Sequence, residues 1–312
     1  MPARAPGATI QEGNSGPHQP DTLMILVVGA TGTLGGLVTR HLVGQRRPLR
    51  VLVRGAHAVS GTPAGFDASV ASSARGDLRD PSSLARAMDG VRTVVTTANS
   101  ALRGGDDTVD SVDRDGNRAL IDAACNAGVR HFVFVSALGA SIDSPVPFLR
   151  AKAETEAHLR ASGLSYSIIA PNVFMDVWVP AVVGRPARAG EPVTLVGEGQ
   201  RRHSQVAIRD VAAFTAAAVD HPAAHNATVT IGGPEAITWR EVVAVYEAEM
   251  GRPIELRSVS PGTPIAGLPD PMPAFLAAFD TYDSPIEMET LAATFGVILT
   301  PLLTIVREDL AK

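Results

Sequence analysis

Residues 23–36 read Leu-Met-Ile-Leu-Val-Val-Gly-Ala-Thr-Gly-Thr-Leu-Gly-Gly, an apolar run that passes directly into closely spaced glycines. An uninterrupted apolar run is typical of a parallel strand that is buried on both faces. The glycines follow a Gly-x-x-Gly-x-x-Gly spacing, and a helix is expected from Leu34 to Gln45. A strand, a glycine-rich turn and a helix in this order are typical of the first unit of a dinucleotide-binding fold.

Each of the three glycines has its own physical role in such a turn. Gly29 permits the tight turn, Gly32 leaves the backbone open to a pyrophosphate, and Gly35 lets the helix pack close to the strand. The N–H groups at the start of the helix then face the phosphates. A purely structural turn has the same spacing, but the position directly after the first strand favours the dinucleotide interpretation.

Strands and helices alternate as far as residue 170. Further strands are expected at 49–53, 69–75, 91–98, 131–135 and 166–170, and helices at 81–88, 109–127 and 147–162. This alternation predicts an α/β fold, a Rossmann doubly wound parallel sheet. Beyond Pro171 the pattern is irregular, with a proline-rich loop expected at 258–273 and helices at 209–219, 238–250, 286–295 and 300–310. Asp210 is expected to cap the first of these helices.

The composition excludes several classes of protein. Of the 312 residues, 45% are hydrophobic and 19% charged, a balance typical of a globular chain. A net charge of -5 argues against a protein that binds nucleic acid by neutralising its phosphates. One cysteine and scattered histidines predict neither a disulfide framework nor a metal site. The sequence contains no apolar stretch that could span a membrane and no recognisable export signal, so a cytoplasmic protein is expected.

The residue after the second strand usually distinguishes the two nicotinamide cofactors. An acidic residue there binds the ribose 2′-hydroxyl of NAD, whereas Arg54 stands at this place. A guanidinium suits a 2′-phosphate, so NADP(H) is favoured, although a solvated surface arginine also fits. Asp77 follows the third strand, where its carboxylate could reach the adenine amino group or cap a turn or helix.

Taken together, these stretches resemble the NmrA-like atypical short-chain dehydrogenases. The resemblance covers about residues 23–310 and rests on the glycine turn, Arg54 and four further segments: 76–78 (Gly-Asp-Leu), 151–156 (Ala-Lys-Ala-Glu-Thr-Glu), 171–175 (Pro-Asn-Val-Phe-Met) and 210–212 (Asp-Val-Ala). That family includes NADPH-dependent quinone and dye reductases, phenylpropanoid reductases and non-catalytic NADP-sensing regulators.

The resemblance implies an NADP-binding Rossmann domain and a smaller, discontinuous substrate-binding part. The expected bounds are a disordered tail at 1–20, the Rossmann domain at 21–170 with a return segment at about 195–232, and the substrate-binding part at 171–194 and 233–312. Cofactor contacts are implied at Gly29, Thr31, Gly32, Thr33, Leu34, Gly35, Arg54, Asp77, Leu78, Thr97, Ala98, Asn99, Lys152, Pro171, Asn172, Val173 and Phe174.

The catalytic pattern of ordinary short-chain dehydrogenases is broken here at the proton donor. Those enzymes carry a tyrosine four residues before a lysine, so that both side chains face the cofactor. Phe148 stands four residues before Lys152, and Ser136 matches the family serine. Lys152, or a water held by Lys152 and Ser136, could supply the proton instead. Lys152 could also be an exposed lysine paired with Glu156, and Ser136 a satisfied turn hydroxyl.

The leading interpretation is an NADPH-dependent oxidoreductase that reduces a small apolar or aromatic carbonyl, a quinone or a polyketide-like compound of secondary metabolism. Phe148, Phe174 and Trp178 are candidates for an apolar substrate wall, although a core role fits Phe174 and Trp178 equally well. Two alternatives remain open, a non-catalytic NADP-sensing regulator and a non-redox biosynthetic enzyme on the same fold. A small-molecule substrate is the expected partner, and the oligomeric state, including a homodimer, is left open.

Overall fold

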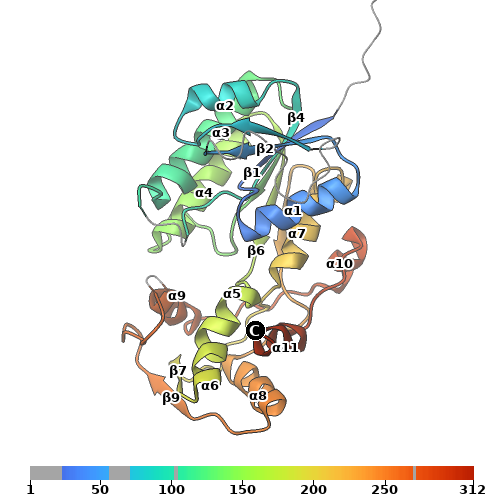
Figure 1. Ribbon diagram of the computed structural model, residues 1–312. Helices are drawn as coiled ribbons and strands as arrows, with labels where there is room; N and C mark the ends of the chain where they lie inside the picture. Colours follow the sequence, from blue (N-terminus) through green and yellow to red (C-terminus); the bar gives the residue numbers. More distant parts are fainter. Residues whose placement is uncertain (1–22, 56–70, 102–104, 270–271) are drawn as a thin grey trace, which may run out of the picture.

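A computed structural model describes residues 23–55, 71–101, 105–269 and 272–312. The tail expected at 1–20 and the first two residues of the strand expected at 69–75 lie outside these ranges. The large sheet has seven strands in the order β3-β2-β1-β4-β5-β6-β8, and every pairing in it is parallel (Figure 1). The strands are β1 (Met24–Val28), β2 (Leu49–Val53), β3 (Ala71–Arg75), β4 (Val91–Thr96), β5 (His131–Val135), β6 (Ser165–Pro171) and β8 (Ala227–Ile231).

Helices cover both faces of this sheet (Figure 1). On one face lie α1 (Thr33–Gly44) and α7 (Ile208–Ala217), and on the other α2 (Pro81–Ala87), α3 (Asp115–Asn126) and α4 (Pro147–Ala161). The apolar run of β1 supplies both layers, because Ile25 and Val27 belong to the core under α1 and α7 while Leu26 and Val28 belong to the opposite core. The expected α/β doubly wound sheet is confirmed.

The chain forms a second part beyond the carboxyl end of β6 (Figure 1). It has its own core, which includes Val179, Leu195, Trp239 and Tyr246. Its elements are α5 (Met175–Val179), the π-helical turn η3 (Pro180–Gly184), α6 (Arg185–Ala189), α8 (Trp239–Met250), α9 (Met272–Phe279), α11 (Leu302–Leu310) and a small parallel sheet of β7 (Val193–Val196) and β9 (Leu256–Val259). Within the described ranges, no helix is both long enough and apolar enough to cross a membrane.

The structure departs from the expected elements in several places. The helix expected at 109–127 is divided into a π-helical turn, η2 (Val109–Arg114), and α3. The expected loop at 258–273 contains the end of β9 and the start of α9. Residues 195–196, at the start of the expected return segment, belong to β7 in the small sheet. The helix α10 (Glu289–Phe295) starts three residues later than expected and packs through Phe295 on the α1–α7 core.

The expected capping role of Asp210 is wrong. The helix α7 already begins at Ile208, whose backbone N–H donates to the Asp176 carboxylate of α5 at 2.7 Å. Asp210 instead accepts hydrogen bonds from the backbone N–H and the hydroxyl of Thr300, both at 2.7 Å. The acidic residue in the first turn of α7 therefore fastens the segment that leads into α11.

The close contact between β1 and α1 explains two of the glycines. Gly29 has φ +89°, and a Cβ on it would lie 2.6 Å from the Thr97 hydroxyl. A Cβ on Gly35 would lie 2.2 Å from the carbonyl oxygen of Gly29. Side chains at these two positions would push α1 away from the carboxyl ends of β1 and β4.

We expect Gly35→Ala to lower the free energy of unfolding by roughly 1–3 kcal/mol, because the backbone of Gly29 would have to move. Gly44→Ala is the matched control in the same helix, since a Cβ there would meet no atom of the described residues within 4 Å. It should raise the free energy of unfolding by about 0.5 kcal/mol. Urea unfolding followed by circular dichroism measures both changes, and equal stability of Gly35→Ala and the wild type would contradict the packing argument.

Candidate cofactor site and active site

The start of α1 offers uncommitted backbone N–H groups. Gly32 is the N-cap residue, no side chain of the described residues caps the helix, and its first turn contains no acidic residue. Thr31, Gly32 and Thr33 are exposed, whereas Leu34 is half-buried and Gly35 buried. Among the described residues, a Cβ on Gly32 would approach only the Gly29 carbonyl, at 3.4 Å, so these residues leave the space above Gly32 open. Open space, free N–H groups and a positive helix end fit the pyrophosphate of a dinucleotide.

Charged side chains gather at the carboxyl ends of β2 and β3. Arg54 donates to the Asp107 carboxylate at 2.8 Å, and Arg79 lies 4.0 Å from the same oxygen. Asp77 accepts from the backbone N–H of Arg79 at 2.9 Å and from its guanidinium at 3.0 Å. These hydrogen bonds lower the pKa of Asp77, and the bond from the Arg79 guanidinium has the largest effect. Two arginines next to each other are suited to a phosphate, with Asp107 holding Arg54 in place.

The carboxyl end of β4 lies against the glycine turn. The backbone N–H of Thr97 donates to the Val28 carbonyl at 3.0 Å, and Thr97 and Ala98 are buried. Asn99 is half-buried and accepts from the backbone N–H of Ala101 at 3.0 Å. Leu78 is also buried and packs in the core under α2 and α3. The structure thus gathers the expected contacts from four separate segments at one edge of the sheet.

Lys152 is 2% exposed, so the alternative of an exposed helix lysine is wrong. Its ammonium donates to the Val135 carbonyl at 3.2 Å and lies 3.4 Å from a carboxylate oxygen of Asp113. The rings of Phe134 and Phe148 lie 5.0 and 5.3 Å from the ammonium nitrogen, within the range of cation–π attraction. Burial lowers the pKa of Lys152, while the negative charges of Asp113 and Glu156 oppose that effect.

Ser136 and Glu156 form a second polar pair beside this lysine. The buried Ser136 hydroxyl donates to the Glu156 carboxylate at 2.5 Å, and Arg160 donates to the other oxygen of Glu156 at 2.9 Å. Glu156 lies one helical turn after Lys152 on α4, so both side chains leave the same face. In this structure the Ser136 hydroxyl is therefore satisfied by a hydrogen bond within the protein, to Glu156, as the alternative interpretation expected.

The segment after β6 is fastened by a chain of side-chain hydrogen bonds. Pro171 is the last residue of β6, and the amide nitrogen of Asn172 donates to the hydroxyl of Ser284 at 3.0 Å. The same hydroxyl lies 2.7 Å from Nδ1 of His203, while Nε2 lies 3.0 Å from the Phe279 carbonyl. Because a carbonyl only accepts, Nε2 carries the proton and Nδ1 accepts from Ser284. Neither His203 nor Ser284 belongs to a recognisable motif, and only the fold brings them to Asn172.

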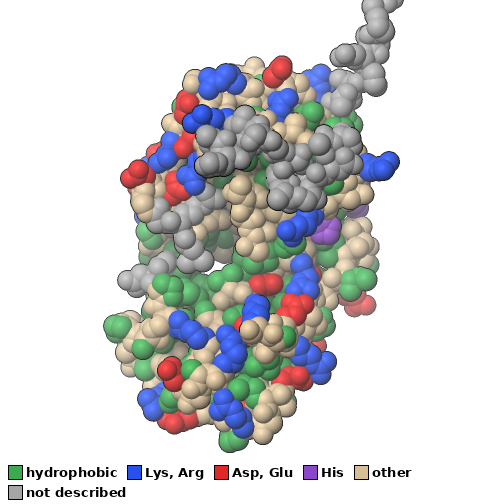
Figure 2. Space-filling model, viewed as in Figure 1, with side chains coloured by type: hydrophobic (Ala, Val, Ile, Leu, Met, Phe, Trp, Pro, Cys, Tyr) green, Lys and Arg blue, Asp and Glu red, His purple; other side chains and the backbone are tan. Residues whose placement is uncertain are grey.

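Of the three expected substrate residues, only Trp178 contacts an aromatic cluster of the second part among the described residues. Trp178 lies edge-on to Phe279 at 5.5 Å and to Phe275 at 6.0 Å. Phe174 pairs with Val206 through an isolated β-bridge. Phe148 lies on α4, against the ammonium of Lys152. In Figure 2 hydrophobic side chains gather where the second part faces the sheet.

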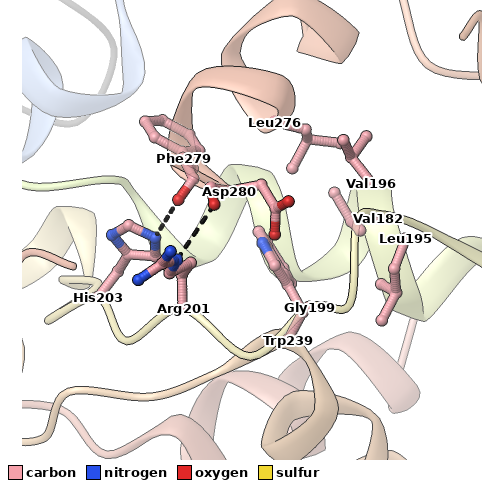
Figure 3. A pocket seen from close by; sticks show the side chains of 10 residues that line it. All are labelled: Val182, Leu195, Val196, Gly199, Arg201, His203, Trp239, Leu276, Phe279 and Asp280. Carbon is pink, nitrogen blue, oxygen red and sulfur yellow. Dashed lines mark hydrogen bonds between the residues drawn. The ribbon is translucent and has the colours of Figure 1, made fainter. Parts of the chain in front are cut away.

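A narrow pocket lies beside this cluster, between the small sheet, α8 and α9. Figure 3 shows the Asp280 carboxylate pointing into it next to the indole of Trp239, with Arg201 bonded to the Asp280 backbone carbonyl at 3.1 Å. The pocket is lined by Val182, Leu195, Val196, Gly199, Arg201, His203, Trp239, Leu276, Phe279 and Asp280. His203 therefore connects this pocket with the segment that follows β6.

The chain belongs to the NmrA-like family, whose model matches residues 21–294. It is 33% identical to an NAD(P)H azoreductase from Xenophilus azovorans over 240 residues, which are 76% of this chain and 77% of that protein. It is 39% identical to the photosystem II assembly factor Ycf39 of Cyanophora paradoxa over 147 residues, which are 47% of this chain and 44% of that protein. An NADPH-dependent quinone oxidoreductase from Escherichia coli, solved with NADPH, shares the fold with a TM-score of 0.74 and 22% identity, over 91% of this chain and 99% of that one.

His203 predicts a pH dependence of stability. Burial lowers its pKa from the ordinary value near 6.5. The unfolded chain therefore binds this proton more readily than the folded chain. The stability that neutral His203 contributes is fully present above about pH 6.5 and is lost as the pH falls below it. Between pH 7.5 and 5.0 we expect the wild type to lose roughly 1 kcal/mol more unfolding free energy than His203→Gln.

Urea unfolding at the two pH values measures this difference. His41→Gln, a change of an exposed histidine on α1, should behave like the wild type. His131 is also buried and has a lowered pKa, but it is present in all three proteins and its effect is therefore subtracted. Identical losses in the wild type and in His203→Gln would contradict the prediction.

Proposed function

We propose that the protein is an NADPH-dependent reductase of small aromatic or quinone-like compounds. The observation that carries this proposal is the buried Lys152 ammonium at the same edge of the sheet as the open glycine turn. A buried cation beside a dinucleotide site is suited to stabilise negative charge on a substrate oxygen. The names of the azoreductase and of the quinone oxidoreductase support the reaction class.

In this proposal the N-terminus of α1 binds the pyrophosphate, and Arg54 with Arg79 binds the 2′-phosphate. Pro171, Asn172, Val173 and Phe174 lie beside the nicotinamide, with Asn172 held by Ser284. The second part, including 171–194 and 233–312, binds the substrate against Trp178 and its aromatic neighbours. These assignments extend the geometry of the described residues to a bound dinucleotide.

NADPH, when bound, supplies a hydride. Lys152 then faces the oxygen that becomes negative and either donates a proton to it or orients a water that does. Phe148 has no proton to give, so its ring serves as an apolar wall and as a cation–π partner of the ammonium. A quinone needs little more help than this, because its reduced oxygen is already well stabilised.

A non-catalytic NADP-binding regulator is the second candidate. Phe148 favours this candidate, because it replaces the usual tyrosine acid. The similarity to Ycf39 also favours it, because that relative is named for assembly rather than for a reaction. Oxidation of NADPH followed by absorbance with a set of quinones and azo dyes separates the two candidates. Turnover supports the reductase, while binding of NADPH without turnover of any compound supports the regulator.

We expect NADPH to bind at least ~10-fold tighter than NADH, a difference of about 1.4 kcal/mol, because Arg54 offers a partner to the 2′-phosphate. Arg54→Ala should remove most of this difference. Arg257→Ala changes an exposed arginine paired with Glu255 in the second part and should leave it unchanged. Calorimetry measures the affinities of all three proteins for both cofactors, and equal binding of both cofactors by the wild type would overturn the assignment of Arg54.

We expect Lys152→Ala to lower kcat about 100-fold or more at saturating NADPH, since one well-placed acid or electrostatic group supplies about that much. Lys312→Ala removes the only other lysine and should have no effect. Phe148→Ala should raise KM more than it lowers kcat. Full turnover by a folded Lys152→Ala variant, checked by circular dichroism, would remove the lysine from the mechanism.

A further inference from the structure

Asp113 is a fully buried carboxylate with an incomplete set of hydrogen bonds. One oxygen accepts from the backbone N–H of Ser100 at 2.9 Å and from its hydroxyl at 2.6 Å. The other oxygen has no hydrogen-bond donor among the described residues and lies 3.4 Å from the ammonium of Lys152. A buried carboxylate is costly unless it is paired, so its place in this core calls for an explanation.

The surrounding structure fixes the position of Asp113. It lies on the π-helical turn η2, which interrupts the helix expected at 109–127. The hydroxyl of Thr155 on α4 donates to the Asp113 carbonyl at 2.9 Å. Gly116, at the start of α3 just after η2, permits a close approach to Leu78, because a Cβ there would lie 2.9 Å from the Leu78 side chain. Short π-helical segments within helices often occur at functional sites, and this one turns the carboxylate toward α4.

The described residues satisfy the Lys152 ammonium only in part. Of its three N–H groups one donates to the Val135 carbonyl, and Asp113 is its ion-pair partner. The charged groups that face it from the described elements are Asp113 on η2 and Glu156 on its own helix, while β5 contributes the Val135 carbonyl and the Phe134 ring. Glu156 already accepts from Ser136 and Arg160, so Asp113 is the carboxylate available to Lys152.

The amino-acid composition makes this lysine distinctive. The chain has 27 lysines and arginines, of which only Lys152 and Lys312 are lysines. Arginine stays charged at any physiological pH, whereas an amine can lose its proton when it is buried. A nearby carboxylate is the means by which a protein keeps such an amine charged.

We propose that Asp113 is a positioning residue for Lys152, which keeps the buried ammonium charged and directed toward the carboxyl edge of the sheet. This role rests on the proposed function, because a reductase needs the cation at that edge. Asp113 does not touch the substrate in this arrangement and acts only through Lys152.

Having only two lysines permits a direct test in the intact protein. With 13Cε-labelled lysine, NMR should give two side-chain signals, and the signal absent from Lys152→Met is that of Lys152. Its titration midpoint should lie at least one pH unit lower in Asp113→Asn than in the wild type, since an opposite charge at this distance shifts a pKa by about 1–3 units. Lys312 serves as the internal reference and should not move.

Asp115→Asn is the matched control, because it makes the same chemical change two residues away on an exposed side chain. It should leave the Lys152 titration where it is. An unchanged midpoint in Asp113→Asn would overturn the proposal, as would an equal shift in Asp115→Asn. This measurement requires no turnover, so it stands apart from the test of the reductase function.

Activity provides the second readout if the protein turns over. In Asp113→Asn the alkaline fall of kcat/KM should begin at least one pH unit lower than in the wild type, because Lys152 then loses its proton earlier. Asp113→Glu, which restores the charge, should recover most of this shift. A uniform loss of activity at every pH would indicate a merely structural residue and would overturn the proposal.

A double-mutant cycle of unfolding free energies tests the pairing if Asp113→Asn folds poorly. The double variant Asp113→Asn with Lys152→Met removes both charges, so it should lose less stability in urea than the two single changes added together. Strictly additive losses would overturn the pairing. If Asp113→Asn alone does not fold, recovery of the fold in the double variant supports the pairing, and failure of both contradicts it.

Discussion

The contact of Gly35 with the backbone of Gly29 is the constraint on which the rest of the structure depends. It allows α1 to start directly at the carboxyl end of β1, with its first N–H groups turned to open space. Since all seven strands of the large sheet are parallel, their carboxyl ends meet at this same edge. Residues that follow β2, β3, β4, β5 and β6 therefore come together around one helix terminus.

Ion pairs are distributed unequally around this edge. At its outer end the side chains of Arg54 and Arg79 are 45% and 38% exposed, so solvent weakens their ion pairs. At its inner end Lys152 and Asp113 are buried together, where breaking the pair would leave an uncompensated charge. The outer pairs are thus suited to binding and release, and the inner pair to holding one cation in a fixed place.

The second part is joined to this edge by polar side chains. Asn172, Ser284 and His203 connect the end of β6 with two segments that are distant in the sequence. Asp176 and Asp210 connect α5 and the segment before α11 with the first turn of α7. Each of these bonds places an element of the second part relative to the sheet, and the aromatic cluster around Trp178 and Phe279 is positioned through them.

The sequence by itself determined six of the seven strands of the large sheet, and it did not reveal the edge strand β8 at 227–231. Apolar runs, glycine spacing and the change between strand-like and helix-like hydrophobic periodicity depend on neighbours within about ten residues. The pattern of strands and helices as far as residue 170 could therefore be predicted from the sequence. The end of the second strand located Arg54, whereas the family resemblance located Lys152 and the absence of a tyrosine at Phe148. Local patterns did not reveal β7, β9 or α9, which are short and lie in segments rich in proline and glycine, where local preference is weak.

Only the tertiary structure decided what these residues touch. Asp113 lies 39 positions before Lys152 in the chain, and no periodicity relates them, yet η2 places their charged groups 3.4 Å apart. Asp107 beside Arg54 and His203 beside Ser284 are likewise pairs made by packing. A sequence pattern reports which face of an element is buried, whereas the partner of a buried charge is chosen by the desolvation cost of the whole assembled core.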